Sequence, residues 1–132
     1  LFTKRSIYNW FKSTRSDYEN EDFFKIYIDY PRVELIKRIS DRTEYMIENG
    51  AISEVKKFIR LKVPRTKTAS KAIGIAEIRG YLEKKIEISE VIEKISIKTR
   101  QYAKRQSTWG RGNMMDWNKI KSEDLNKFLK KI

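Results

Sequence analysis

The chain has 132 residues, and its 30 Lys and Arg side chains outnumber its 18 Asp and Glu side chains to give a net charge of +12. This length is enough for one domain with a single core. The positive charge favours a phosphate-bearing partner, above all a nucleic acid, because each phosphate that a cation neutralises releases a condensed counterion. No apolar run approaches the roughly 18 residues of a membrane span and no secretory signal is found, so we expect a cytoplasmic protein without a membrane partner.

The chain contains neither histidine nor cysteine. The missing imidazole and thiol exclude disulfides, the common zinc sites, and nucleophile systems of the Ser-His or Cys-His type. Any catalysis would therefore rest on carboxylates, lysines or a bound metal. Because the first residue is Leu1 and not methionine, we expect the chain to be part of a longer protein.

The N-terminal segment predicts a short helix, a loop and a strand. Residues 6–13 carry apolar side chains three and four positions apart behind Ser6, which can cap the helix, and residues 13–22 are polar, as in a loop. Residues 23–30 alternate aromatic and β-branched side chains, a pattern typical of a strand, and Pro31 ends it. No second strand is evident, so we expect this strand to pair with sequence outside the chain.

The rest of the chain predicts helices. Apolar residues recur at helical spacing over residues 33–50, 51–61, 71–85 and 90–108, and again in a short tail after residue 122. Gly50 is expected to stop the first of these helices, Ser89 to cap the long one and Ser122 to cap the last. Residues 60–71 hold five basic and no acidic side chains, as in an exposed loop. The predicted fold class is therefore mainly α with one strand.

The long helix has two faces when its residues are projected at about 100° each. One sector is expected to pack: Val91, Ile95, Thr99, Tyr102 and Gln106. The adjacent sector and the back of the helix are polar and mostly cationic: Lys94, Lys98, Arg100, Gln101, Lys104 and Arg105. No acidic residue occurs between Lys94 and Arg111. We therefore expect no carboxylate of this helix, one turn away, to neutralise the cations.

The end of this helix allows two interpretations. A charged stripe is by default the solvated side of a surface helix. Gln106, Thr108, Trp109 and Arg111, however, gather amide, hydroxyl, indole and guanidinium groups where the helix is expected to stop. RNA recognition uses such a mixture, because unpaired bases stack on aromatic rings while Arg and Lys hold phosphates. Trp109 could equally anchor a core.

At these residues the sequence resembles a known family. "TRQYAKRQSTW", residues 99–109, closely resembles the C-terminal signature of the tRNA dimethylallyltransferases, also called tRNA isopentenyltransferases. Three further stretches are similar to that family in order and spacing: "KRSIYNWF" at residues 4–11, "PRVELIKRISDRTEYMIENGAISEV" at 31–55 and "KAIGIAEIRGYLEKKIEISEVIEKI" at 71–95. The resemblance covers Lys4 to about Trp117.

The resemblance implies both a fold and an activity. The chain would be the C-terminal helical part of an α/β P-loop enzyme of nucleotide-kinase type. Such an enzyme transfers a dimethylallyl group from dimethylallyl diphosphate to N6 of adenosine 37, in tRNAs that read codons beginning with U. Mg²⁺ assists, and the adenine is drawn out of the anticodon loop into a channel. The implied partners are the tRNA anticodon stem-loop and dimethylallyl diphosphate, and the intact enzyme is expected to be a monomer.

The resemblance also assigns site residues by position. Two groups fall where the family contacts tRNA: Lys71, Ala72 and Gly74, and then Lys104, Arg105, Gln106, Thr108, Trp109 and Arg111. Arg42 aligns with an arginine near the diphosphate, where a guanidinium can stabilise the departing charge. Arg38, one turn earlier, either supports it or is a plain surface residue.

The sequence departs from the family pattern at several positions. Ile75 and Ala76 follow Gly74 where the family has tyrosine and a basic residue, Gly110 replaces a bulky apolar residue, and Lys4 replaces a glycine. These changes bear on RNA affinity more than on the fold.

The family's Gly-rich phosphate loop is missing. The five glycines, at 50, 74, 80, 110 and 112, form no G-x-x-x-x-G-K, and no general-base aspartate follows such a loop. We therefore expect no catalytic residue and no metal site in this chain, which would be inactive alone. Residues 1–31 would form a helix, loop and strand, and residues 32–132 a helical tRNA-binding region of the same unit. The alternatives are a stand-alone basic helical module that binds nucleic acid, or helices that serve assembly only.

Overall fold

The structure, a computed structural model, describes residues 6–130. The sequence difference at Lys4 lies outside these residues. The helices are α1 (Ile7–Ser13), α2 (Arg32–Met46), α3 (Ile52–Arg60), α4 (Ile75–Leu82), α5 (Ile88–Asn113) and α6 (Leu125–Leu129), and the strands are β1 (Ile26–Asp29) and β2 (Asn118–Lys121). The prediction of a mainly helical chain is confirmed.

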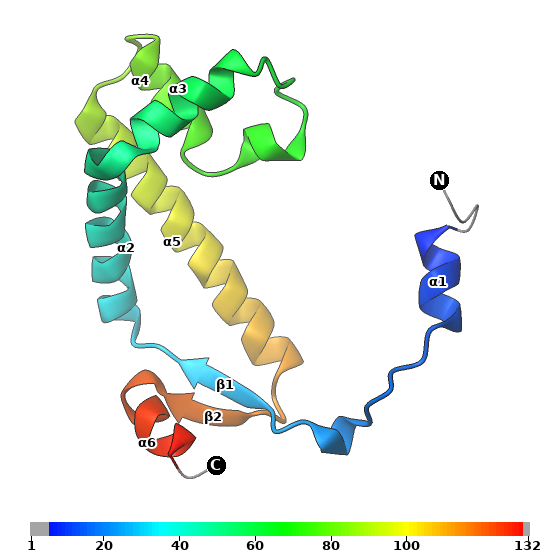
Figure 1. The fold of residues 1–132 in the computed structure, drawn as a ribbon. Coiled ribbons are helices and arrows are strands. Elements are labelled where there is room, and N and C mark those ends of the chain that lie inside the picture. Colours follow the sequence, from blue (N-terminus) through cyan, green and yellow to red (C-terminus); the bar gives the residue numbers. More distant parts are fainter. Residues whose placement is uncertain (1–5, 131–132) are drawn as a thin grey trace.

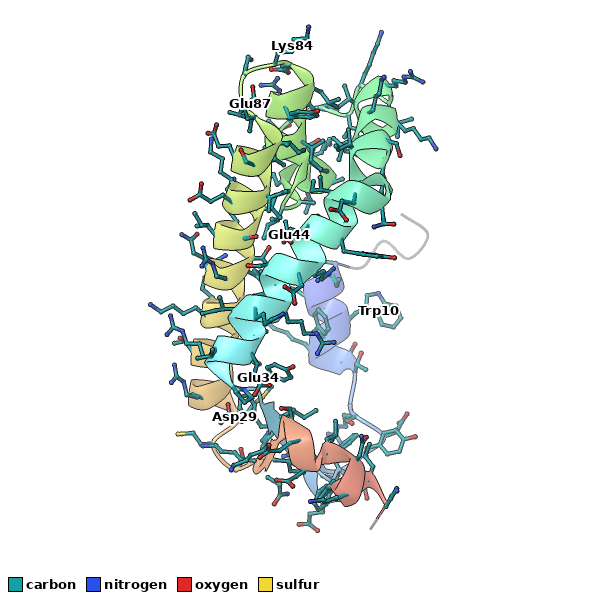
Figure 2. The ribbon with its side chains drawn as sticks, turned by 90° about the vertical axis from the view of Figure 1, so that its left-hand side faces the viewer. Trp10, Asp29, Glu34, Glu44, Lys84 and Glu87 are labelled. Carbon is teal, nitrogen blue, oxygen red and sulfur yellow. The ribbon has the colours of Figure 1, made fainter. Side chains whose placement is uncertain are left out.

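The two long helices define the shape of the molecule. Figure 1 shows α2 and α5 close together beneath α3 and α4, from where they separate as they run toward the small sheet at the opposite end. The sheet and α6 close the wide end, while α1 stands apart from both helices. Helix α1 buries none of its residues, and Figure 2 shows Trp10 projecting from it away from α2.

The predicted strand has a partner inside the chain. β1 pairs with β2 in parallel, from Ile26 opposite Asn118 to Asp29 opposite Lys121. The expectation of one strand that pairs only with sequence outside the chain is therefore wrong. We could not predict β2 from the sequence, because its four residues, Asn-Lys-Ile-Lys, contain only one apolar side chain. One apolar residue cannot show the alternation that marks a half-buried strand.

Several predicted helix ends are confirmed and others are wrong. Ser6 caps α1, its hydroxyl accepting a hydrogen bond from the backbone N–H of Asn9 at 3.2 Å. Gly50 has a φ of +110° and divides α2 from α3 as expected. Ser122 does not cap the tail helix, because it lies inside a 3-10 turn that precedes α6.

The two helices nearest the predicted site differ most from expectation. Helix α4 begins at Ile75 and not near Lys71, since Gly74 has a φ of +104°, outside the helical region. Helix α5 begins behind Glu87, not Ser89, and continues to Asn113. The expected helix end near Thr108 is therefore wrong, because the terminal turns tolerate both of their glycines.

The core lies where α2, α3, α4 and α5 meet. Its buried apolar residues are Ile47, Ala51, Val55, Ile78, Val91 and Ile95. The inward sector of α5 is thus confirmed for its first half only: Tyr102 is 50% exposed and Gln106 is exposed. The sector stops packing because α5 and α2 diverge toward the sheet (Figure 1).

Candidate nucleic-acid interface

A cavity of about 640 Å³ lies between α2 and α5, and we call it the first cavity. Its polar lining is Tyr30, Arg38, Arg42, Thr43 and Thr99. The structure thus places Arg42, the predicted diphosphate ligand, beside Arg38 in one cavity. Arg38 also lies over the Tyr30 ring, 5.9 Å from its centroid, a cation–π contact that orients the guanidinium. Within residues 6–130 neither arginine has a carboxylate partner, so both charges are available to an anion.

The loop before α4 borders the first cavity. Ile73 lines it, so the predicted tRNA-contacting residues Lys71, Ala72 and Gly74 lie beside it in the chain. Lys71 and Ala72 are exposed, whereas Gly74 is buried. A Cβ at Gly74 would lie 3.5 Å from Ile95 Cδ1, and the positive φ already excludes most side chains there.

A buried carboxylate, Glu77, fixes this loop. One Glu77 oxygen accepts a hydrogen bond from the backbone N–H of Gly74 at 3.0 Å, and the other accepts from Lys98 of α5. Burial raises the pKa of Glu77 and is the largest single influence on it. The hydrogen bonds from Lys98 and from the backbone N–H groups of Glu77 and Gly74 outweigh burial, so the pKa lies below its ordinary value. The charged carboxylate therefore ties the loop to α5.

We did not predict a role for Glu77, although the sequence carries a signal for it. The residue stands three positions after Gly74, the spacing of the acidic residue in a capping box. Its partner Lys98 is 21 positions away, so only the fold could bring the two together.

The cationic stripe of α5 is partly neutralised. Lys94 forms an ion pair with Glu90, one turn earlier, at 2.5 Å, and Lys98 pairs with Glu77. The expectation that no carboxylate of α5 would neutralise the stripe is wrong at Lys94, because Glu90 lies four positions before it, just outside the acid-free segment. Four cations of α5 form no ion pair within residues 6–130: Arg100, Lys104, Arg105 and Arg111.

The predicted tRNA-contacting residues of α5 do not share one face. Lys104 and Arg111, seven positions apart, line a second cavity of about 600 Å³. At about 100° per residue, Arg105 and Trp109 lie on a different side of the helix, about 130° away. Trp109 is 59% exposed, so in this structure it is not a core anchor. The residues of this one sequence signature therefore contribute to two different surfaces of α5.

The side that carries Trp109 offers groups suited to bases. Arg105 lies over the ring of Tyr102, 5.8 Å from its centroid, and the ring is half exposed. Gln106 is exposed one position further on. Thr108 lies between this side and the one that carries Lys104, and it donates its hydroxyl hydrogen to the Lys104 carbonyl at 3.0 Å, which leaves the oxygen as an acceptor.

Gly110 has a structural explanation. It is buried within α5, and a Cβ there would lie 2.7 Å from Cε2 of the Tyr27 ring. The missing side chain lets β1 approach α5 closely. The departure from the family pattern thus coincides with a packing contact to Tyr27.

The described residues offer no obvious metal site. Among residues 6–130 no group of three or more carboxylates could hold a metal ion. This part of the chain therefore holds no cage of three or more carboxylates for the Mg²⁺ that the resemblance implies. Across the same residues, no helix combines the length and apolarity that crossing a bilayer requires.

Comparisons with known proteins agree with one another. The family model described as IPP transferase matches residues 1–113. The tRNA dimethylallyltransferase of Pelagibacter ubique is 47% identical over 131 residues, which are 99% of this chain and 42% of that protein. The enzyme of the same name from Halothermothrix orenii is 38% identical over 109 residues, 82% of this chain and 33% of that protein.

Solved structures give the same result. The tRNA delta(2)-isopentenylpyrophosphate transferase of Staphylococcus epidermidis matches with a TM-score of 0.69 and 31% identity, over 80% of this chain and 34% of that one. The full-length Bacillus halodurans tRNA isopentenylpyrophosphate transferase has a TM-score of 0.67 and 32% identity, over 85% and 35%. The chain thus spans less than half of the proteins it matches. The resemblance in the sequence is confirmed: the chain belongs to the IPP transferase family.

Proposed function

We propose that the chain is the tRNA-binding part of a tRNA dimethylallyltransferase that transfers a dimethylallyl group to N6 of adenosine 37. The observation that carries the proposal is the pair Arg38 and Arg42 in the first cavity, bordered by the loop that holds Lys71. This arrangement supports an anion site beside an RNA-contacting segment, which the transfer reaction requires.

The first cavity suits dimethylallyl diphosphate. Two guanidinium groups can hold the diphosphate through charge-assisted hydrogen bonds. The apolar lining suits the hydrocarbon group: Leu35, Ile39, Met46, Ile73 and Ile95. In the reaction, N6 of adenosine attacks the carbon that carries the diphosphate. The new C–N bond forms as the C–O bond breaks, and the electron pair leaves with the diphosphate.

Within this chain, the arginines stabilise the leaving group. Negative charge grows on the bridging oxygen as the C–O bond breaks, and a preorganised guanidinium favours that charge. The proton of N6 goes to a base that the rest of the enzyme supplies, because neither a phosphate loop nor the aspartate that follows it occurs in this sequence. We assign no step to Mg²⁺.

The exposed side of α5 suits the anticodon loop. Gln106 lies seven positions after Thr99, which lines the first cavity, so both side chains are on the same side of the helix. Trp109 and Arg105 lie next to that side and are exposed. An unpaired base can stack on the indole while Arg105 holds a phosphate.

Exposed apolar side chains are consistent with a larger enzyme. Phe24 is 61% exposed, Ile28 46% and Val33 82%. A parallel sheet is normally covered on both faces, yet β1 and its partner are largely open. We propose that the remaining part of the enzyme covers these residues and supplies catalysis, and that the chain alone is inactive.

RNA binding tests the proposal. The chain should bind a synthetic anticodon stem-loop that contains unmodified adenosine 37, and Arg105→Ala should weaken binding and flatten its salt dependence. Arg60→Ala, an exposed arginine of α3 outside both cavities, is the control. An unchanged salt slope for Arg105→Ala would contradict the contact. Equal affinity for unrelated RNA hairpins would favour a stand-alone basic nucleic-acid-binding module.

A further inference from the structure

The second cavity is cationic. It lies beside the sheet, between the ends of α2 and α5 that diverge from each other. Five of its lining residues carry positive charge: Arg32, Arg100, Lys104, Arg111 and Lys119. Its one acidic lining residue is Asp29, which Figure 2 shows at the sheet end of α2. The cavity therefore has an excess of four positive charges over negative ones.

These charges are not neutralised elsewhere. In the part of the chain that the structure describes, none of the five cations forms an ion pair, although nearby lysines do: Lys121 pairs with Glu123 and Lys25 with Asp116. Like charges that gather in a concave surface repel one another and concentrate a positive potential. Such a cavity attracts an anion.

The second cavity is distinct from the first. The two share Tyr30, Leu35 and Ile39, but they meet different sides of α5. The first cavity contacts α5 at Ile95 and Thr99, whereas the second contacts it at Arg100 and Lys104. The cavities therefore adjoin at their shared residues but meet different sides of α5.

The spacing of the cations favours a chain of phosphates over a single small anion. Arg100 and Arg111 are eleven positions apart on α5, about 16 Å along its axis at 1.5 Å per residue. Arg32 and Lys119 add charge from α2 and β2. One diphosphate cannot contact both ends of this row, whereas successive phosphodiesters of one strand can.

We propose that the second cavity binds the sugar-phosphate backbone of the tRNA, with Arg32, Arg100 and Lys119 as contacts beyond those that the family resemblance assigns. This inference rests on the proposed function in taking the anion to be tRNA. It explains why Lys104 and Arg111 face away from Trp109. The RNA is held by base stacking on one side of α5 and by phosphate contacts on the other.

The test removes two charges without touching any residue that the resemblance assigns. Arg100→Gln and Lys119→Gln are combined, and binding of the anticodon stem-loop is measured over a range of salt concentrations. The binding constant falls as salt rises, and each lost phosphate contact should make the plot of log binding constant against log salt concentration shallower by about 0.7 to 0.9. The charge-matched control combines Lys57→Gln and Arg60→Gln, two exposed residues of α3 that line neither cavity, and its slope should remain unchanged.

Two further arms make the result specific. The charge-retaining variant Arg100→Lys with Lys119→Arg should keep the slope of the unaltered chain, and circular dichroism should show equal helix content in all variants. Titration with inorganic diphosphate should give equal affinities for the Gln double variant and the unaltered chain, whereas Arg42→Gln should weaken this binding.

The outcomes separate this inference from the proposed function. If Arg105→Ala flattens the salt slope but the Gln double variant does not, tRNA binding stands, Arg100 and Lys119 do not contact the RNA, and the inference is overturned. If the double variant loses diphosphate affinity and keeps RNA affinity, the cavity binds a small anion and the inference is wrong. If α3 and cavity variants change the slope equally, net charge alone is responsible, and the inference is again overturned.

Discussion

The buried carboxylate of Glu77 should contribute measurably to the free energy of unfolding, so Glu77→Ala, which removes it, should destabilise the chain. The Glu77 side chain is 4% exposed and accepts hydrogen bonds from Gly74 and Lys98. A buried N–H left without an acceptor costs about 1–3 kcal/mol. Lys98 is 51% exposed, so water replaces much of that interaction and the ion pair adds little. Loss of one buried methylene adds about 0.8 kcal/mol.

The free energy of unfolding should therefore fall by about 2–4 kcal/mol, measured by urea unfolding followed by circular dichroism. Glu77→Gln should cost less, because its amide oxygen can still accept from Gly74. Glu93→Ala, at an exposed position of α5, should stay within about 0.5 kcal/mol of the unaltered chain. A loss below about 1 kcal/mol for Glu77→Ala would refute the view that this carboxylate holds the loop.

Three further predictions concern pH, packing and base stacking. The pKa of Glu77 is lower in the folded state than in the unfolded state, so the carboxylate stabilises the fold above about pH 4.3 and loses this effect as the pH falls through the folded-state pKa. The difference in unfolding free energy between the unaltered chain and Glu77→Gln should therefore shrink in acid. A difference that stays constant with pH would contradict the lowered pKa. A Cβ at Gly112 has no atom within 4 Å, so Gly112→Ala should stabilise α5, whereas a Cβ at Gly110 meets the Tyr27 ring. Gly110→Ala should therefore be about 1–3 kcal/mol less stable than Gly112→Ala, as the midpoints of urea unfolding would show. Equal midpoints would exclude the contact with Tyr27. Trp109→Ala should weaken anticodon stem-loop binding by about 1–3 kcal/mol in fluorescence titrations, and an unchanged affinity would remove stacking from the proposal.

Local signals in the sequence were sufficient for features that depend on neighbouring residues. The Ser6 cap and the stop at Gly50 follow from the chemistry of those residues alone. The buried positions Val91 and Ile95 follow from helical spacing. Such features are predictable because the partners lie within one turn of each other.

Features that depend on distant residues were not predictable. β2 becomes a strand because β1 supplies its backbone hydrogen bonds from the other end of the chain. Lys98 meets its carboxylate on another helix. Helical spacing alone separates Lys104 and Arg111 from Arg105 and Trp109, but which of these two sides faces a cavity depends on where α2 packs.

The central claim is that this chain supplies the tRNA-binding surface of a prenyl-transferring enzyme and the arginines that bind its diphosphate. The most direct measurement mixes the chain with the part of the Pelagibacter ubique relative that lies outside the matched region. It then follows transfer of a radiolabelled dimethylallyl group from its diphosphate to the anticodon stem-loop. Label should enter the RNA only when both parts are present, and Arg42→Gln should reduce its incorporation. A folded complex of the two parts that binds the RNA but transfers no label would contradict the claim.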